Sequence, residues 1–242
     1  MKAMILAAGL GSRLRPLTND RPKALVEVAG KSLLEITLRR LSEFGIREVI
    51  VNVHHFADMV VDYLKQHDSF GMRVEISHED GLLDTGGGLK KAAWFFQGGE
   101  EPFVLHNVDV ISTIDLQRMV EFHQQSNPLA TLAVQDRQTS RYLLFDPQDR
   151  LCGRRTGPDG KPELVTNALE TKGLAFSGVH VISSRLLGLM TEEGVFSIIK
   201  TYLRLAAEGE NICAFRADEY YWRDLGKPEN VEQAAKDLGR AS

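Results

Sequence analysis

The residues best suited to chemistry stand in the first 25 positions, where two glycines and two cations follow a short apolar run. The run Lys2–Leu6 is typical of a buried strand. Gly9 and Gly11 come soon after it, and glycine lets the backbone turn tightly and approach a ligand closely. Backbone N–H groups in such a turn can hold phosphate oxygens, and Arg13 and Lys23 would add positive charge. These residues indicate a polyphosphate site.

Two widespread phosphate motifs do not fit this chain. A dinucleotide fingerprint G-x-G-x-x-G beginning at Gly9 would need its third glycine at position 14, which is Leu14. The tripeptide Gly30-Lys31-Ser32 has the form of the end of a P-loop, but the first glycine of that motif would fall on Leu25. We therefore interpret this tripeptide as a turn followed by a helix N-cap, and the sequence disfavours a dinucleotide oxidoreductase.

The N-terminal stretch resembles the signature of the sugar-1-phosphate nucleotidylyltransferases, also called NDP-sugar pyrophosphorylases. The matching segments are Leu6–Leu14 (LAAGLGSRL), Pro16–Thr18 (PLT) and Pro22–Leu25 (PKAL). The resemblance implies that a nucleotidyl group passes from an NTP to a sugar 1-phosphate, with release of pyrophosphate. It implies nucleotide binding by the residues at and after the first strand, namely Leu6, Ala8, Gly9, Gly11, Ser12 and Arg13.

Composition and length restrict the remaining possibilities. The chain has 242 residues, of which 43% are hydrophobic, and this suits a single large α/β domain. The formal net charge of −4 gives no reason to expect a nucleic-acid partner. Cys152 and Cys213 lie far apart without metal-ligand spacing, which favours reduced thiols. We expect a cytoplasmic enzyme with no membrane partner, because neither a signal peptide nor a membrane-length apolar run is visible.

Strand-like and helix-like segments alternate in the first half of the chain. Glu48–Val53 and Arg73–Ser77 read as further buried strands. Ser32–Phe44 has helical spacing, with Ser32 and Glu35 as a capping box and Gly45 as its end. This alternation predicts an α/β fold with a doubly wound, mostly parallel, Rossmann-like sheet. Ligands of such sheets bind beyond the carboxyl ends of the strands.

A glycine-rich segment, Leu82–Leu89 (LLDTGGGL), follows the third predicted strand. Asp84 or Thr85 can cap a helix predicted over Gly86–Phe96. A helix start without side chains would let a flat ring lie against backbone N–H and C=O groups. In the resembled family this segment borders the base and ribose, which implies nucleotide contacts by Glu79, Thr85 and Gly86. Its Thr-Gly-Gly-Gly form resembles the short uridylyl- and guanylyltransferase branches.

Two aspartates distant in the sequence are candidate ligands of Mg²⁺. Asp109 follows the predicted strand Pro102–His106, and a carboxylate there, beside a phosphate loop, suits Mg²⁺. The resemblance implies that Asp109 and Asp224 both bind the metal, Asp224 in a Trp-x-Asp-x-Gly context. Where the family has glycine before the first aspartate, this chain has Val108. Capping of the helix that starts near Pro228 is the alternative role of Asp224.

The second half of the chain is expected to bind the acceptor. We predict a single domain, with residues 1–134 as the nucleotide half and residues 135–242 as the sugar-phosphate half, including a small β-rich insertion. A predicted hairpin with arms 141–146 and 150–154 precedes a loop over 156–172 and a strand over 173–182. The resemblance implies that sugar-phosphate contacts come from Lys23, Asn107 and Gly178.

The implied chemistry assigns catalytic roles to Arg13, Lys23 and Asp109. Mg²⁺ between two phosphates would lower their repulsion, and Arg13 would stabilise the leaving pyrophosphate. A cytidylyltransferase for a non-sugar phosphate such as phosphocholine, and a non-catalytic sensor permitted by Val108, remain alternatives. The short form leans towards UTP with an amino-sugar acid 1-phosphate, or GTP with mannose or heptose 1-phosphate. The oligomeric state stays open.

Overall fold

Four parallel strands make up the N-terminal part of the sheet. The computed structural model describes residues 1–239. In it, β1 (Lys2–Leu6) lies between β4 (Glu48–Val53) and β6 (Phe103–Asn107), and β5 (Arg73–His78) pairs with β4. All three pairings are parallel, so the carboxyl ends of the four strands meet at one edge of the sheet, as the sequence predicts.

Helices cover both faces of this sheet. Alternate residues of β1 belong to different cores, because Ala3 and Ile5 face one and Met4 and Leu6 the other. The first core is closed by α1 (Leu33–Glu43), α2 (Ala57–Gln66), α4 (Leu116–Ser126) and α7 (Pro228–Gly239). The second is closed by α3 (Asp84–Lys91), α5 (Arg185–Gly188) and α6 (Ile198–Ala207). The predicted doubly wound architecture is confirmed.

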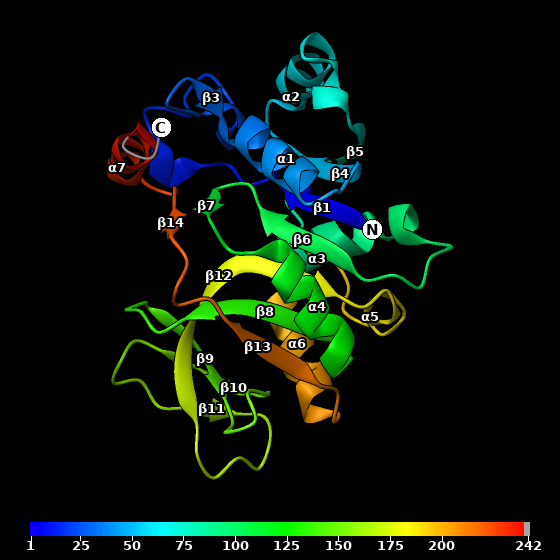
Figure 1. The fold of residues 1–242 in the computed structure, drawn as a ribbon, viewed down its shortest axis with the longest axis vertical. Helices are drawn as coiled ribbons and strands as arrows, with labels where there is room; N and C mark the ends of the chain where they lie inside the picture. Colours follow the sequence, from blue (N-terminus) through cyan, green and yellow to red (C-terminus); the bar gives the residue numbers. More distant parts are fainter. Residues whose placement is uncertain (240–242) are drawn as a thin grey trace.

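The C-terminal part of the sheet is mixed. The long strand β12 (Lys172–Ile182) runs antiparallel to β6 and pairs on its other side with β8 (Ala130–Gln135) and β9 (Arg141–Phe145). The sheet continues through β10 (Leu151–Thr156) to the edge strand β11 (Glu163–Leu164), and β13 (Ile212–Arg216) extends it beside β8. Figure 1 shows this β-rich part below the parallel strands. One ten-stranded sheet thus crosses both predicted halves of the chain.

A short antiparallel ladder outside the main sheet brings the end of the chain back to its middle. β7 (Val110–Ser112) follows β6 and pairs with β14 (Trp222–Asp224), with Asp224 opposite Val110. In Figure 1, β14 connects the lower, β-rich part to α7 beside the N-terminal segment. A second ladder joins β2 (Glu27–Val28) to β3 (Lys31–Ser32), and its turn confirms the interpretation of Gly30.

Three local predictions need correction. Ser32 Oγ accepts a hydrogen bond from Glu35 N at 3.0 Å, but the Glu35 carboxylate binds Arg39 and Tyr63, so the reciprocal half of the capping box is missing. The helix expected over residues 86–96 begins at Asp84 without a side-chain cap and ends at Lys91, followed by a 3₁₀ turn. The sequence also predicts helices over Ser183–Met190 and Val195–Ala207, but the helices formed there are shorter, at α5 and α6. Within residues 1–239, no helix combines the length and apolar character needed to cross a membrane.

Candidate active site

A cavity of about 430 Å³ opens where the carboxyl ends of β1, β4, β5 and β6 meet. Of the residues predicted to bind nucleotide, those that line it are Leu6, Ala8, Gly9, Glu79 and Thr85. Lys23, Asn107 and Asp109 line it as well, whereas Gly11, Ser12, Arg13 and Gly86 lie outside its lining. We call this space the nucleotide cavity, because five of the nine residues predicted to bind nucleotide line it.

Gly11 connects the glycine loop to the segment that carries Lys23. Its φ of +62° is left-handed, and a methyl group there would lie 2.9 Å from Thr18 Cγ2 and 3.2 Å from Lys23 Cβ. The Thr18 hydroxyl donates a 2.8 Å hydrogen bond to the Gly11 carbonyl. Only glycine meets both demands without strain, and the close approach brings Lys23 towards Gly9, whose added methyl would lie 3.6 Å from Lys23 Nζ.

Lys23 and Asp109 form a shielded ion pair on the cavity wall. Lys23 Nζ lies 2.8 Å from Asp109 Oδ2, and the two side chains are only 14% and 12% exposed. Val108 beside it is fully buried in the core, and its N–H donates to the Leu6 carbonyl at 3.1 Å. The valine that replaces the family's glycine therefore points into the core and leaves the cavity open.

Asn52, which the sequence analysis missed, holds the glycine loop in place. Its Oδ1 accepts a 2.7 Å hydrogen bond from Ala7 N, and its Nδ2 donates to Glu79 Oε1 at 2.7 Å. Glu79 Oε2 accepts from Leu83 N at 3.1 Å. Glu79 thus has both oxygens bonded within the protein, and its part in nucleotide contact stays a prediction. The sequence signal that could have identified Asn52 is its polar amide within the otherwise mostly apolar strand EVIVNV.

The three glycines of α3 allow close packing: Gly86 and Gly87 face the loop before α6, and Gly88 faces the side chains of Asn52 and Glu79. Gly86 and Gly87 donate their N–H groups to the Phe196 carbonyl at 2.9 and 3.2 Å. A methyl group on Gly87 would lie 2.5 Å from the Gly194 carbonyl oxygen. The Thr85 hydroxyl accepts from Ile198 N at 3.0 Å. These N–H groups are therefore taken by the loop before α6, which corrects the interpretation that a flat ring lies against them.

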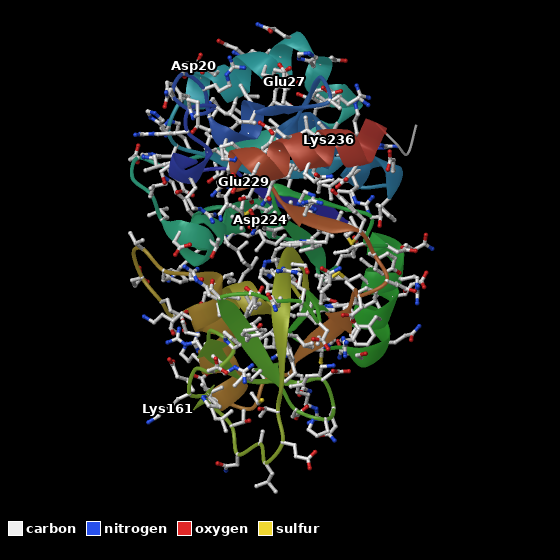
Figure 2. The ribbon with its side chains drawn as sticks, turned by 90° about the vertical axis from the view of Figure 1, so that its left-hand side faces the viewer. Asp20, Glu27, Lys161, Asp224, Glu229 and Lys236 are labelled. Carbon is white, nitrogen blue, oxygen red and sulfur yellow. The ribbon has the colours of Figure 1, made fainter. Side chains whose placement is uncertain are left out.

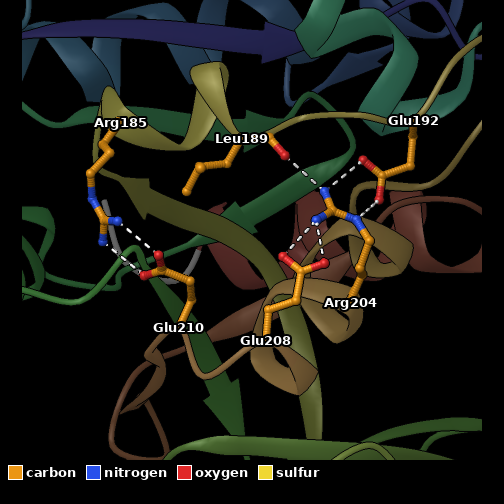
Figure 3. Close-up of polar contacts among 6 residues, drawn as sticks. All are labelled: Arg185, Leu189, Glu192, Arg204, Glu208 and Glu210. Atoms are coloured by element: carbon orange, nitrogen blue, oxygen red, sulfur yellow. Dashed lines mark hydrogen bonds and ion pairs between the residues drawn. The ribbon is translucent and has the colours of Figure 1, made fainter.

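Ion pairs anchor the loop between α5 and α6, which borders both halves of the site. Figure 3 shows Arg204 of α6 bonded to Glu192, Glu208 and the Leu189 carbonyl. Glu192 is 6% exposed in its side chain. Farther along this loop, Val195 lines the nucleotide cavity and Ser197 lines a second cavity.

The second cavity, of about 570 Å³, lies over the antiparallel strands. We call it the acceptor cavity. Its wall comes from the β9–β10 hairpin, β12, the start of α6, and β14. Asn107, Gly178 and Asp224 line it, and Asn107 belongs to both cavities. The sequence analysis did not predict that arginines and the aromatic residues Tyr142 and Trp222 would line this cavity.

Gly178 gives Asn107 room at the boundary of the two cavities. Its φ is +76°, and a methyl group there would lie 2.9 Å from Asn107 Nδ2 and 2.8 Å from Val110 Cγ2. The register of β12 against β8 shifts between Phe176 and His180. This irregularity is a β-bulge, a device that redirects side chains beside functional sites.

The β7–β14 ladder brings the two predicted metal ligands to this boundary. Leu225 N donates to the Asp109 carbonyl at 2.7 Å, so Asp224 and Asp109 stand one position apart across the ladder. Asp109 lines the nucleotide cavity and Asp224 the acceptor cavity. Figure 2 shows Asp224 between the part of the molecule that carries α7 and the β-rich part.

Arg13 reaches the same boundary from the glycine loop. A methyl group on Gly226 would lie 2.7 Å from Asp224 Oδ1 and 2.8 Å from Arg13 Nη2, so both side chains crowd one point. Asp224 Oδ1 accepts from Gly226 N at 2.6 Å. This bond closes the turn just before α7, and it is the part of the alternative helix-capping role that the Asp224 carboxylate fulfils.

The donor set at the boundary suits a hard cation with few protein ligands. Among residues 1–239, no group of three or more histidine, cysteine or acidic side chains could enclose a metal ion. Two carboxylates are what Mg²⁺ commonly takes from a protein, since it keeps waters and substrate phosphates in its other positions. Asp109 and Asp224 therefore fit the predicted cofactor.

Histidines lie behind the site and remain neutral. Burial lowers the pKa of His106 to about 4 and the pKa of His180 to about 3. His106 Nδ1 lies 2.8 Å from the Asn107 carbonyl, and His180 Nδ1 lies 2.9 Å from the Tyr202 hydroxyl. Neither residue lines the described cavities, so both belong to the packing behind Asn107.

The comparisons with known proteins agree with this geometry. The chain is 37% identical over 247 residues to N-acetylmuramate alpha-1-phosphate uridylyltransferase of Caulobacter vibrioides, covering 99% of this chain and 97% of that protein. It is 28% identical over 232 residues to mannose-1-phosphate guanyltransferase of Yarrowia lipolytica, covering 95% of this chain and 62% of that protein. The chain therefore spans less than two thirds of this second relative.

Solved structures share the fold at low sequence identity. A UDP-glucose pyrophosphorylase from Acinetobacter baumanii superposes with a TM-score of 0.81 at 20% identity, covering 99% of this chain and 93% of the other. HddC from Yersinia pseudotuberculosis, complexed with GMP-PN, gives 0.76 at 22% identity, covering 98% and 99%. Because residues 2–240 match the family described as nucleotidyl transferase, this chain belongs to the nucleotidyl transferase family.

Proposed function

We propose that this protein transfers a nucleotidyl group from an NTP to a sugar 1-phosphate, giving an NDP-sugar and pyrophosphate. One observation carries the proposal: the β7–β14 ladder sets Asp109 in the nucleotide cavity and Asp224 in the acceptor cavity, one position apart. A nucleotide in the first cavity and a sugar phosphate in the second would meet between them. Asn107, which lines both cavities, would contact both reactants there.

Asp109 and Asp224 would hold Mg²⁺ at this meeting point. The bound ion would lower the repulsion between the two anions and favour an in-line approach. Asp109 is shielded by Lys23, which forms an ion pair with it at 2.8 Å. When a nucleotide binds, Lys23 would exchange this carboxylate for a phosphate oxygen, leaving Asp109 free for the metal.

The remaining residues of the signature would stabilise charge during the transfer. An oxygen of the sugar phosphate attacks the α-phosphorus, and the bond from that phosphorus to the pyrophosphate oxygen breaks. Arg13 would stabilise the negative charge that develops on the leaving pyrophosphate. The attacking phosphate is already ionised at pH 7, so no general base is needed. Lys23 and Asn107 would hold the acceptor phosphate in place.

The donor base is proposed as uracil, with guanine as the second choice. The named uridylyltransferase is matched over 97% of its length, whereas the chain covers 62% of the named guanyltransferase. A phosphocholine acceptor is disfavoured by the acceptor cavity. Arg137 covers one face of Trp222, with its Cζ 3.5 Å from the ring centre, so an ammonium group cannot stack on that face.

The test measures pyrophosphate release with the four NTPs, a panel of sugar 1-phosphates and Mg²⁺. We expect turnover with wild-type protein and a loss of about 10³-fold in kcat for Asp109→Asn and for Asp224→Asn, equal to about 4 kcal/mol. Glu229→Gln, on the exposed first turn of α7, is the matched control and should keep full activity. Nucleotide binding without turnover in every combination would support a sensor and refute the proposal.

A further inference from the structure

The acceptor cavity contains more unpaired positive charge than one phosphate requires. Its lining includes Arg137, Arg141, Arg155 and Lys200. Among the residues that the structure describes, none of these four cations has a carboxylate within ion-pair distance, whereas neighbouring Arg154 pairs with Glu163 at 2.7 Å. The surplus is local, because the whole chain carries a net charge of −4.

Two of these cations, Arg137 and Arg155, are held in a similar way. The Arg137 guanidinium stacks 3.5 Å over Trp222 and donates from Nη2 to the Phe176 carbonyl at 2.8 Å. The Arg155 guanidinium lies 5.0 Å over Tyr142. In both residues Nε is buried and has no hydrogen-bond partner in the described structure. Buried donors are almost always paired, so the two unbonded Nε–H groups show that these guanidinium groups hold donor capacity that the described residues do not use.

The two guanidinium groups belong to different ends of the cavity. Arg137 stacks on Trp222, two residues before Asp224, and therefore lies at the phosphoryl-transfer end. Arg155 is on β10, which is separated from β6 by β9 and β12. The Arg155 side chain extends across β9, so that its Nη2 lies beside Gly173 of β12, three residues from Phe176, whose carbonyl accepts from Arg137. Three residues of a strand span roughly 10 Å, more than one phosphate group. Gly173 leaves room for Arg155, since a methyl group there would lie 3.0 Å from its Nη2.

We propose that Arg155 forms a second anion subsite, which binds a carboxylate carried by the sugar 1-phosphate. The proposal rests on the proposed function, because it names the acceptor of that reaction. Arg137 would bind the 1-phosphate, while Arg155 pairs its fork with both carboxylate oxygens. Arg141 and Lys200 raise the positive potential around the sugar, which attracts a doubly charged acceptor over a neutral one.

Two matched substrate pairs test the subsite and locate the carboxylate on the sugar. Glucose 1-phosphate and glucuronic acid 1-phosphate differ by a carboxylate at C6. N-acetylglucosamine 1-phosphate and N-acetylmuramic acid 1-phosphate differ by an ether-linked lactic acid. With UTP and Mg²⁺, we expect the acidic member of at least one pair to have kcat/KM about 10²-fold higher than its neutral partner, the value of a charge-assisted bidentate contact. The pair that shows the preference identifies the position of the carboxylate.

Variants of the hairpin connect the preference to Arg155. Arg155→Met should abolish the preference by raising KM for the acidic member about 10²-fold, with the neutral member unchanged. Arg155→Lys keeps the charge without the fork and should restore part of the preference. Arg150→Gln, an exposed charge change in the same hairpin outside the cavity lining, is the control and should behave as wild type. Thermal unfolding of each variant shows that the hairpin is intact.

Two outcomes separate the failure of the subsite from the failure of the proposed function. If neutral acceptors are used as well as or better than their acidic partners, or if Arg155→Met lowers activity equally with both, the carboxylate subsite is refuted while nucleotidyl transfer stands. If no acceptor of either kind releases pyrophosphate with any NTP, the proposed function itself fails.

Discussion

The two cavities differ in how their charges are balanced. In the nucleotide cavity, Lys23 pairs with Asp109, and Glu79 is bonded to Asn52 and to Leu83 N. In the acceptor cavity, Arg137 and Arg155 have no carboxylate partner among the described residues, and each leaves a buried Nε unbonded. The cations of the first cavity are thus balanced within the protein, whereas Arg137 and Arg155 of the second have no carboxylate partner among the described residues.

The difference indicates where specificity resides. A cavity whose polar groups already satisfy one another is held in shape before a nucleotide binds, and the proposed exchange at Lys23 depends on the phosphates that every NTP carries. A cavity with unpaired cations discriminates, because an acceptor without the matching anions leaves those donors unsatisfied. We therefore expect substitutions in the nucleotide cavity to lower turnover generally and substitutions in the acceptor cavity to change substrate preference.

The largest effect is expected from breaking the ion pair of the nucleotide cavity. Lys23→Met should lower kcat by about 10²-fold or more, because it removes a cation from the transferring phosphate. It should also lower the free energy of unfolding by about 1–3 kcal/mol, since Asp109 is left shielded and unpaired. Steady-state kinetics and urea unfolding measure the two effects. Arg118→Gln, which breaks the exposed Arg118–Glu219 pair, should cost no more than about 1 kcal/mol and leave kcat unchanged.

A smaller effect is expected from displacing the residue shared by both cavities. Gly178→Ala would push a methyl group to within 2.9 Å of Asn107 Nδ2, so kcat/KM should fall about 10-fold, the effect of about 1.4 kcal/mol on the barrier. Gly157→Ala is the matched control, because its φ of +71° is similar but nothing lies within 4 Å. Equal losses in the two variants would mean that backbone strain, not Asn107, is responsible.

The loop before α6 should respond more weakly. Arg204→Gln removes the anchor of buried Glu192 shown in Figure 3, and it should cost about 1–3 kcal/mol of stability and raise KM a few-fold for both substrates. The exposed Arg185–Glu210 pair in the same figure supplies the control. Arg185→Gln should change stability by less than about 1 kcal/mol. A KM change for one substrate only would show that the loop serves a single cavity.

The smallest effect on activity is expected from the buried histidines, which make stability depend on pH but lie outside the lining of both cavities. Burial lowers the pKa of His106 and His123 to about 4 and of His180 to about 3, below the value of about 6.5 for unfolded histidine. The unfolded chain therefore takes up protons first as pH falls from about 6.5 towards 4, and the folded state loses stability.

Each buried histidine lowers the free energy of unfolding by up to about 1.4 kcal/mol for each pH unit by which the pH falls in that range. Urea unfolding at several pH values measures this dependence. The free energy of unfolding of His123→Gln should fall less steeply with falling pH than that of the wild type, by the slope that one histidine contributes. The exposed His67→Gln should keep the wild-type slope. An unchanged slope in His123→Gln would contradict the assignment of a neutral, buried His123.

The parts of the fold and site that could be predicted are those with local causes. Apolar runs and helical spacing identified β1, β4, α1 and β12 within a few residues, since burial requires such patterns wherever the elements pack. The signature stretch predicted that Gly9 and Lys23 belong to one site, and both line the nucleotide cavity. Residues 86–96 were mispredicted because packing against Phe196, rather than a cap, decides where α3 begins.

Residues whose partners are remote could not be predicted. Asn52 of β4 accepts a hydrogen bond from Ala7, which follows the neighbouring strand β1. Arg155 packs on Tyr142 because the register of β9 and β10 sets the two residues opposite each other. The assignments of Arg13, Gly11 and Ser12 to the nucleotide, and of the metal to two aspartates, remain predictions. The division of the domain near residue 134 also remains a prediction. Strands of both halves belong to one sheet.

The sequence alone determined the strand–loop–helix order, the glycine loop and its two cations, because these depend on backbone freedom and on residues close along the chain. Only the tertiary structure decided that Asp224 returns beside Asp109, since β14 pairs with β7 across more than a hundred residues of sequence. It also decided that unpaired arginines gather in the acceptor cavity. Their positions depend on strand register, which a single sequence does not specify.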